Sequence, residues 1–156
     1  MRVSYEWLKT MVDVPDDPHE LVDEFVRTGT EVEAVERLGA DIRDVVTSQV
    51  LEKVPHPDSD HLFVCKMDVG ACNVDADGKP VPLQVVCGAQ NFEQGDKTVT
   101  ALVGARLPGG IEIKRGKLRG IESLGMNCSS RELGLDDDHS GIMILPPDAP
   151  VGVDFT

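Results

Sequence analysis

Two short segments of the sequence combine residue types that ligate metal ions. In the first, residues 56–61 (HPDSDH), two histidines and two carboxylates lie within six positions. Their spacing is not that of a tetrahedral zinc site, and Asp58 and Asp60 fit a turn after Pro57 equally well. We therefore expect a turn here and assign no metal ligand.

The second segment, residues 73–78 (NVDADG), matches the first half of a calcium-binding loop, with oxygen ligands at positions 1, 3 and 5 and glycine at position 6. The match ends there, because position 12 is Gln84 instead of a bidentate glutamate. The flanking residues also resemble strands and not helices. We interpret the segment as a polar hairpin tip between two strands.

Nucleophilic catalysis would need an activated thiol or hydroxyl. No C-x-x-C pair occurs, and no spacing ties a histidine base to Cys87 or Cys128, the two cysteines that adjoin small residues. Residues 104–110 lack the Gly-Lys-Ser/Thr ending of a phosphate-binding loop. We predict no catalytic residue, and we expect reduced thiols in a cytoplasmic protein at all four cysteines, Cys65, Cys72, Cys87 and Cys128.

The remaining candidate chemistry is electrostatic. The chain carries a net charge of −13, which disfavours binding to a phosphate backbone. The segment from Lys97 to Arg119 differs, since it holds six basic residues and one acidic residue, a net charge of +5 that leaves −18 for the rest. Its basic residues could follow an RNA backbone, or they could be solvated charges on a mixed strand ladder.

The elements that position these residues change along the chain. Residues 5–12 predict a short helix with Trp7, Leu8 and Met11 facing inward. A second helix is expected to begin at Asp17 as N-cap, with Pro18 at the first position and Glu20 completing a capping box, and to end near Gly29. Residues 30–38 predict a strand, and residues 39–44 a linker.

After the linker, short apolar segments between turns predict strands. Phe63, Cys65, Met67 and Val69 alternate onto one face, which is typical of a half-buried strand. Residues 129–133 could form one helical turn, with Ser129 and Glu132 at capping-box spacing. Such short strands indicate a small closed barrel, and we place them at residues 45–54, 62–69, 83–87, 98–103, 111–114, 117–119 and 142–145.

Three ordered motifs resemble those of the tRNA-binding domain, an oligonucleotide-binding-fold (OB-fold) module. They are residues 50–62 (VLEKVPHPDSDHL), residues 86–91 (VCGAQN) and residues 107–129 with LPGG, KLRGIESLGM and CS. The resemblance implies an α+β fold, in which a small N-terminal α/β segment precedes a five-stranded OB-fold barrel. The residues expected to contact tRNA are Asn91, Arg106, Lys114, Arg115, Lys117, Arg119, Ser123, Met126 and Ser129.

The flanking sequences resemble the β subunits of bacterial phenylalanyl-tRNA synthetases. The matching segments are MRVSYEWL at residues 1–8, GTEVE at residues 29–33 and LPPDAP at residues 145–150. The resemblance implies a parent ligase that joins phenylalanine to tRNA with ATP and magnesium, as an α2β2 assembly with an α subunit. Its aminoacylation and editing sites would lie outside these residues, so no cofactor is expected within them.

The same resemblance implies a domain organisation. Residues 1–39 would form part of a discontinuous domain, residues 40–150 the barrel, and residues 151–156 the return to the first domain. No membrane segment is expected, since no apolar run approaches the roughly 18 residues that a span needs.

One departure from the family bears on function. The family often has lysine where this chain has His61, so a permanent cation is replaced by a side chain that is mostly neutral at pH 7. Together with the acidic total charge, this leaves an alternative function open. The chain would then be a scaffold for the α2β2 assembly, with little direct RNA contact.

Overall fold

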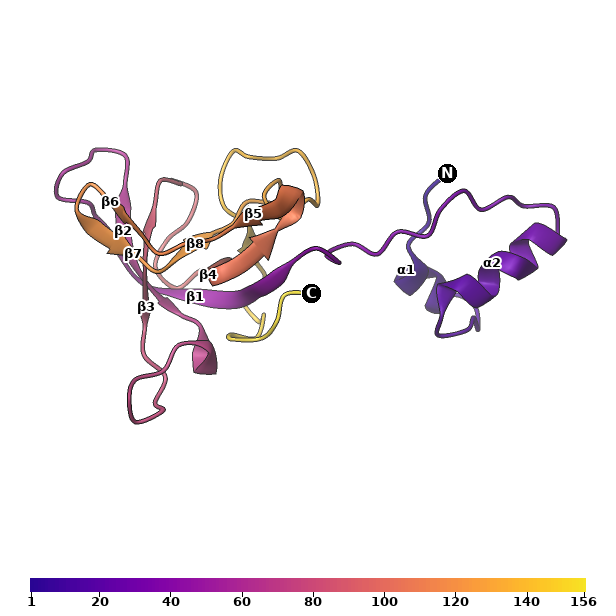
Figure 1. The fold of residues 1–156 in the computed structure, drawn as a ribbon, viewed down its shortest axis with the longest axis horizontal. Coiled ribbons are helices and arrows are strands. Elements are labelled where there is room, and N and C mark those ends of the chain that lie inside the picture. The colour runs from indigo at the N-terminus through magenta and orange to yellow at the C-terminus, as the bar shows by residue number, and fades with distance from the viewer. The chain divides into compact units, whose positions relative to one another are not determined.

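The computed structural model describes residues 1–156, which divide into two compact units, Met1–Arg37 and Leu38–Thr156. The first unit holds both α-helices, α1 (Tyr5–Lys9) and α2 (Pro18–Arg27). The second unit holds all the strands of the chain (Figure 1). The structure is therefore a small helical part plus an antiparallel sheet, each of which is described by itself.

The predicted start of α2 is confirmed. The Asp17 side chain accepts a hydrogen bond from the His19 backbone N–H at 2.9 Å, and Pro18 occupies the first helical position, where a missing N–H costs nothing. The predicted capping box is wrong, because Glu20 makes no return bond to Asp17; only its backbone N–H contacts the Asp17 carbonyl oxygen.

No side chain in residues 1–37 is buried. The prediction that α1 turns Trp7 and Met11 inward is wrong within this unit, since their exposed fractions are 57% and 64%. The strand predicted at residues 30–38 is also wrong, because these residues join no sheet. The apolar face of a helix is buried in a hydrophobic core only when another element packs against it.

The second unit is built around a long strand, β1 (Arg43–Pro55), which pairs antiparallel with β2 (Phe63–Asp68) on one side and β4 (Lys97–Leu107) on the other. The remaining strands of this sheet extend it in the order β3-β2-β1-β4-β5, with β8 and β9 also paired to β4; they are β3 (Leu83–Cys87), β5 (Ile111–Glu112), β8 (Gly125–Asn127) and β9 (Ile144–Leu145).

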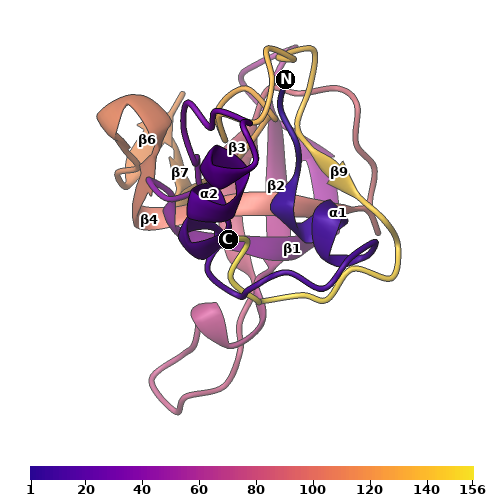
Figure 2. The same ribbon diagram turned by 90° about the vertical axis from the view of Figure 1, so that its right-hand side faces the viewer.

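Strands β6 (Gly116–Leu118) and β7 (Ile121–Ser123) form a separate two-stranded hairpin. Two short 3-10 helices complete the unit, η1 (Gly70–Cys72) and η2 (Pro108–Gly110). The loop that carries η1 extends away from the sheet in both views (Figures 1 and 2). It ends in the polar hairpin tip predicted at residues 73–78, where the Asp75 carboxylate accepts backbone N–H bonds from Asp77 and Lys79.

The core consists of two clusters of buried apolar side chains. One surrounds Met67, Val85 and Phe92, and the other surrounds Val45, Val99 and Leu107. A buried hydroxyl network joins strands between them: Ser48 Oγ lies 2.7 Å from Thr100 Oγ1, which donates to Asn127 Oδ1 at 2.8 Å. No buried side-chain nitrogen or oxygen lacks a hydrogen-bond partner, so this polar core is fully satisfied.

Most predicted strands are confirmed, and the alternation of Cys65, Met67 and Val69 is confirmed by their complete burial. Strands β7 and β8 were missed because each has three residues, too few to show a period. Residues 129–133 make the single helical turn that was predicted, since Leu133 N donates to the Ser129 carbonyl oxygen at 3.2 Å. The predicted Ser129–Glu132 box is also present, because the Ser129 N–H donates to Glu132 Oε2 at 2.7 Å.

The structure does not reproduce two features that the family resemblance implies, a closed barrel and the return of residues 151–156 to the first domain. No ladder joins β3 to β8, so the sheet is not shown to be closed. Residues 151–156, expected to return to the first domain, belong to the second unit and bond along β1, with Phe155 N donating to the Val45 carbonyl oxygen at 2.9 Å. At Val45–Thr47 the edge of β1 opposite β4 lies beyond the end of β2, so it offers these residues unpaired backbone groups.

Candidate functional site

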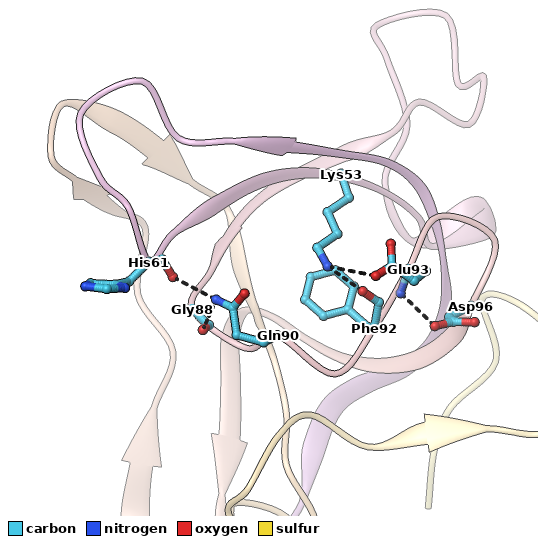
Figure 3. A network of polar contacts seen from close by, with 7 residues as sticks. All are labelled: Lys53, His61, Gly88, Gln90, Phe92, Glu93 and Asp96. Atoms are coloured by element: carbon cyan, nitrogen blue, oxygen red, sulfur yellow. Dashed lines mark hydrogen bonds and ion pairs between the residues drawn. The ribbon is translucent and has the colours of Figure 1, made fainter.

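The three motifs converge on one another through hydrogen bonds between their loops. In the loop of residues 56–61, His56 contacts the Leu118 carbonyl oxygen at 3.0 Å, and the Asp58 carbonyl oxygen accepts from Arg119 at 2.9 Å. Gln90, in the second motif, donates to the His61 carbonyl oxygen at 3.4 Å (Figure 3). Segments far apart in sequence thus form one continuous surface.

The β6–β7 hairpin and the two residues just before it, Lys114 and Arg115, carry most of the predicted cations. The two-residue turn of the hairpin has positive φ at Arg119 (47°) and Gly120 (86°), the combination that a type I′ turn needs. Arg115 is neutralised by Glu122, whose carboxylate lies 2.6 Å from its guanidinium. Lys114 and Lys117 are exposed and form no ion pair, so they remain available to an anion.

A hollow of about 670 Å³ lies where the second and third motifs meet. Met126 and Ser129 line it, together with the exposed Arg131 and His139. Asn91 borders this region and holds its rim, because its amide donates to the Ile142 carbonyl oxygen at 2.8 Å and accepts from the Ile142 N–H at 3.0 Å.

Eight of the nine predicted tRNA contacts fall into three places, and the ninth, Ser123, is the last residue of β7. Lys114, Arg115, Lys117 and Arg119 lie on or beside the hairpin, and Asn91, Met126 and Ser129 lie at the hollow. Arg106 lies apart from both, in a smaller hollow of about 380 Å³ that also contains Arg43.

Two of the nine residues are held inside the protein. The Ser123 side chain is 5% exposed; its hydroxyl accepts from the Val86 N–H and donates to the Gly125 carbonyl oxygen, so it is not free to contact a ligand. Ser129 is 7% exposed, and its hydroxyl donates to Glu132.

Lys53 is an important residue that the sequence reasoning missed. Its ammonium lies close to two aromatic rings, 4.3 Å from the centroid of Phe63 and 4.4 Å from that of Phe92; Figure 3 shows it beside Phe92. It donates to the Phe92 carbonyl oxygen at 2.5 Å and lies 3.6 Å from a Glu93 carboxylate oxygen. The available signal was its position within the first motif, next to apolar Val54 in a predicted strand.

The two segments that resemble metal-binding loops in the sequence, residues 56–61 and 73–78, form turns in the structure. No three His, Cys, Asp or Glu side chains gather closely enough to hold a metal ion. His56 is 3% exposed, and its Nδ1 accepts from the Asp58 N–H at 3.0 Å, as in the predicted turn.

The cysteines are all unpaired, and three are buried. Burial raises the pKa of the Cys65 thiol to about 12, with a smaller contribution from Cys87. Burial likewise raises the pKa of Cys128 to about 12 and raises that of Cys87. A nucleophilic thiol needs the opposite shift, so none of these three buried thiols is activated as a nucleophile.

The chain is similar to known proteins over the segment that contains the three motifs. The sequence model of the family described as "Putative tRNA binding domain" matches residues 45–154. The phenylalanine–tRNA ligase beta subunit of Nitrosospira multiformis is 47% identical over 155 residues, 99% of this chain and 19% of the relative. That of Anaeromyxobacter dehalogenans is 48% identical over 147 residues, 94% of this chain and 17% of the relative. The chain therefore spans less than a fifth of the length of these relatives.

Among solved structures, a methionyl-tRNA synthetase (MetRS) related protein from Pyrococcus horikoshii is 17% identical, with a TM-score of 0.47, over 90% of this chain and 96% of that one. Neither helix of the present chain has the length and apolar composition that crossing a bilayer requires.

Proposed function

Since the chain belongs to the family of tRNA-binding domains, we propose that it is the non-catalytic, RNA-binding N-terminal part of a phenylalanine–tRNA ligase β subunit. The observation that carries the RNA-binding role is a pair of lysines without ion-pair partners, Lys117 on the hairpin and Lys114 just before it, on an otherwise acidic chain. The first motif holds the hairpin in place.

The parent protein would attach phenylalanine to tRNA with ATP and magnesium. It would work in the cytoplasm, with an α subunit as partner in an α2β2 assembly. The relatives of that name are about five times longer than this chain, which leaves ample sequence for the aminoacylation and editing sites elsewhere. Residues 1–156 would bind RNA and position it for the rest of the enzyme.

The proposed fold of residues 40–150 is a five-stranded OB-fold barrel. Three hydrogen bonds support closure between β3 and the β7–β8 region. Leu124 N donates to the Gln84 carbonyl oxygen at 2.8 Å, Gln84 Nε2 donates to the Glu122 carbonyl oxygen at 2.8 Å, and Val86 N donates to Ser123 Oγ at 3.0 Å. A partly open barrel of this kind presents loops and a sheet face to oligonucleotides.

The contacts with tRNA would be mainly to the phosphate backbone. Aromatic residues make up 4% of the chain, and the two nearest to the motifs, Phe63 and Phe92, are occupied by Lys53. Base stacking therefore has few platforms here. Exposed cations would carry the affinity, with Asn91 and the buried hydroxyls of Ser123 and Ser129 keeping the surface in shape. Arg106 would add a separate contact.

The test is a titration of the chain with tRNA at two salt concentrations. The double substitution Lys114→Glu and Lys117→Glu should weaken binding and lower the salt slope, by roughly 0.9 for each phosphate that the hairpin no longer neutralises. The matched control, Arg37→Glu with Lys79→Glu, makes the same charge change at two exposed residues that form no ion pair. Equal effects in both variants would overturn a specific role for the hairpin.

A scaffold role is the second candidate, and the net charge of −13 favours it. In that case the hairpin substitutions would leave tRNA affinity unchanged and would instead disturb assembly with the α subunit. Size-exclusion chromatography of the full β subunit with α, carrying the same two substitutions, separates the candidates.

A further inference from the structure

We propose that His56 is the residue that positions the basic hairpin for RNA, because its ring links the first motif to the hairpin tip. The inference rests on the proposed function, since it explains how Lys117 and Arg119 are held in place to meet a phosphate chain. It gives a role to the histidine that resembled a metal ligand in the sequence.

The ring of His56 has one tautomer that fits its surroundings. Nδ1 lies 3.0 Å from the Asp58 backbone nitrogen, which can only donate, so Nδ1 must be the acceptor. The proton of the neutral ring is therefore on Nε2, which donates to the Leu118 carbonyl oxygen at 3.0 Å. At 3% exposure, neither bond is readily replaced by water.

The hairpin depends on such external support. Strands β6 and β7 pair only with each other, through three residues each, and an isolated two-stranded hairpin is marginal in water. Its base is tied to β3, where Gln84 donates to the Glu122 carbonyl oxygen at 2.8 Å. Its tip is tied to the first motif by His56 and by the bond from Arg119 to the Asp58 carbonyl oxygen.

The bond from His56 ends on Leu118, and this position determines which part of the hairpin it can orient. Leu118 lies between Lys117 and Arg119 and is the last residue of β6 before the turn. Holding its carbonyl oxygen fixes the orientation of the peptide unit that joins Leu118 to Arg119, and this unit helps set the direction of the cationic side chains on either side. Without the bond the cations would be present but unaligned, which increases the entropy cost of binding RNA.

Three substitutions at His56 separate its two bonds. Glutamine places an amide nitrogen near Nε2, so His56→Gln keeps a donor to Leu118 but loses the acceptor for Asp58. Asparagine places its amide near Nδ1, so His56→Asn keeps the turn but loses the bond to the hairpin. His56→Phe fills the space and makes neither bond.

The measurements are tRNA affinity at one fixed salt concentration and the backbone dynamics of residues 117–120 by NMR without RNA. We expect His56→Gln to bind like the unsubstituted chain, with a rigid tip. His56→Asn and His56→Phe should bind roughly three- to tenfold more weakly, with mobile tips, as expected when one or two phosphates are no longer neutralised. In the unsubstituted chain, ¹⁵N shifts of His56 should show protonated Nε2 and unprotonated Nδ1.

The outcomes distinguish this inference from the proposed function. Weak tRNA binding by the unsubstituted chain would overturn the function, while the NMR results would still test the link between His56 and the hairpin. Equal affinity and equal dynamics in the Asn, Gln and Phe variants would overturn the positioning role. If a variant fails to fold, Arg119→Leu probes the other bond of the tip and should likewise raise its mobility.

Discussion

Single side chains connect the segments of the site. Asn91 forms a two-bond pairing with the backbone of Ile142, and this pairing is possible because residue 141 is glycine. A Cβ atom at Gly141 would overlap three atoms of the Asn91 amide, far inside van der Waals contact. The glycine is therefore required by its neighbour, and not by its own backbone conformation.

Gly141→Ala should displace the Asn91 amide and lower the free energy of unfolding by about 1–3 kcal/mol, the usual cost of overpacking. The control is Gly116→Ala, where the nearest atom to the added Cβ is the Lys114 carbonyl oxygen at 4.0 Å. Urea denaturation followed by circular dichroism measures both. A destabilisation by Gly116→Ala as large as that by Gly141→Ala would contradict the explanation.

Lys53 should contribute to stability more than an ordinary strand lysine. Lys53→Met removes a hydrogen bond to Phe92 and two cation–π interactions from a side chain that is 10% exposed, and should cost about 1–2 kcal/mol. Lys79→Met, at an exposed turn, controls for the removal of charge. Thermal unfolding of the two variants should differ clearly; similar melting temperatures would show that the cation is dispensable.

The buried cysteines predict both a pattern of thiol labelling and a dependence of stability on pH. Only Cys72 is exposed, so iodoacetamide at pH 8 should label one thiol in the folded chain and four after unfolding, as counted by mass spectrometry. Burial raises the folded-state pKa of Cys65 and Cys128 to about 12, so both thiols stay protonated in the folded and the unfolded chain at low pH and do not change its stability there. The free energy of unfolding should fall as the pH rises above about 8.5, the pKa of a cysteine in the unfolded chain. Rapid labelling of Cys65 in the folded chain would contradict this.

Among the elements, β1 and β4 organise the sheet, and their alignment is set partly by polar groups. Ser48 on β1, Thr100 on β4 and Asn127 on β8 share one buried hydrogen-bonded chain. Apolar side chains alone allow neighbouring registers, whereas a buried donor must meet its acceptor at one position. The β6–β7 hairpin has no such internal constraint, which is why the contacts from the first motif matter.

Thr100→Val should destabilise the chain by about 1–3 kcal/mol, because Asn127 Oδ1 loses its donor in a buried site. Removing both partners, as Thr100→Val with Asn127→Leu, should cost less than the sum of the single changes. A double-mutant cycle in urea measures this coupling. Strict additivity would show that the two side chains act independently.

At the scale of the whole molecule, the two units differ in what holds them. The core clusters draw on residues 42–142, whereas residues 1–37 bury no side chain. A chain that begins at Leu38 should therefore keep the urea midpoint of residues 1–156. In the longer chain, amides of residues 1–37 should exchange with solvent much faster than those of β1 and β4. A lower midpoint after truncation would mean that the first unit stabilises the second.

The sequence by itself determined features that depend on local chemistry. Asp17 and Pro18 predict the start of α2 because capping needs only neighbouring backbone groups. The alternation around Cys65 and Met67 predicts a half-buried strand for the same local reason. The motifs predict the family through their order along the chain, and the +5 segment identifies the cations of the hairpin.

Tertiary structure alone decided which of these residues face outward and which hold the site together. Ser123 and Lys117 are both polar, yet one is buried and the other is exposed, because Ser123 on β7 is hydrogen-bonded to Val86 on β3 while Lys117 on β6 faces outward. His56 and Leu118 are 62 positions apart, and no local pattern pairs them. Such contacts depend on how distant segments pack, which sequence periodicity does not encode.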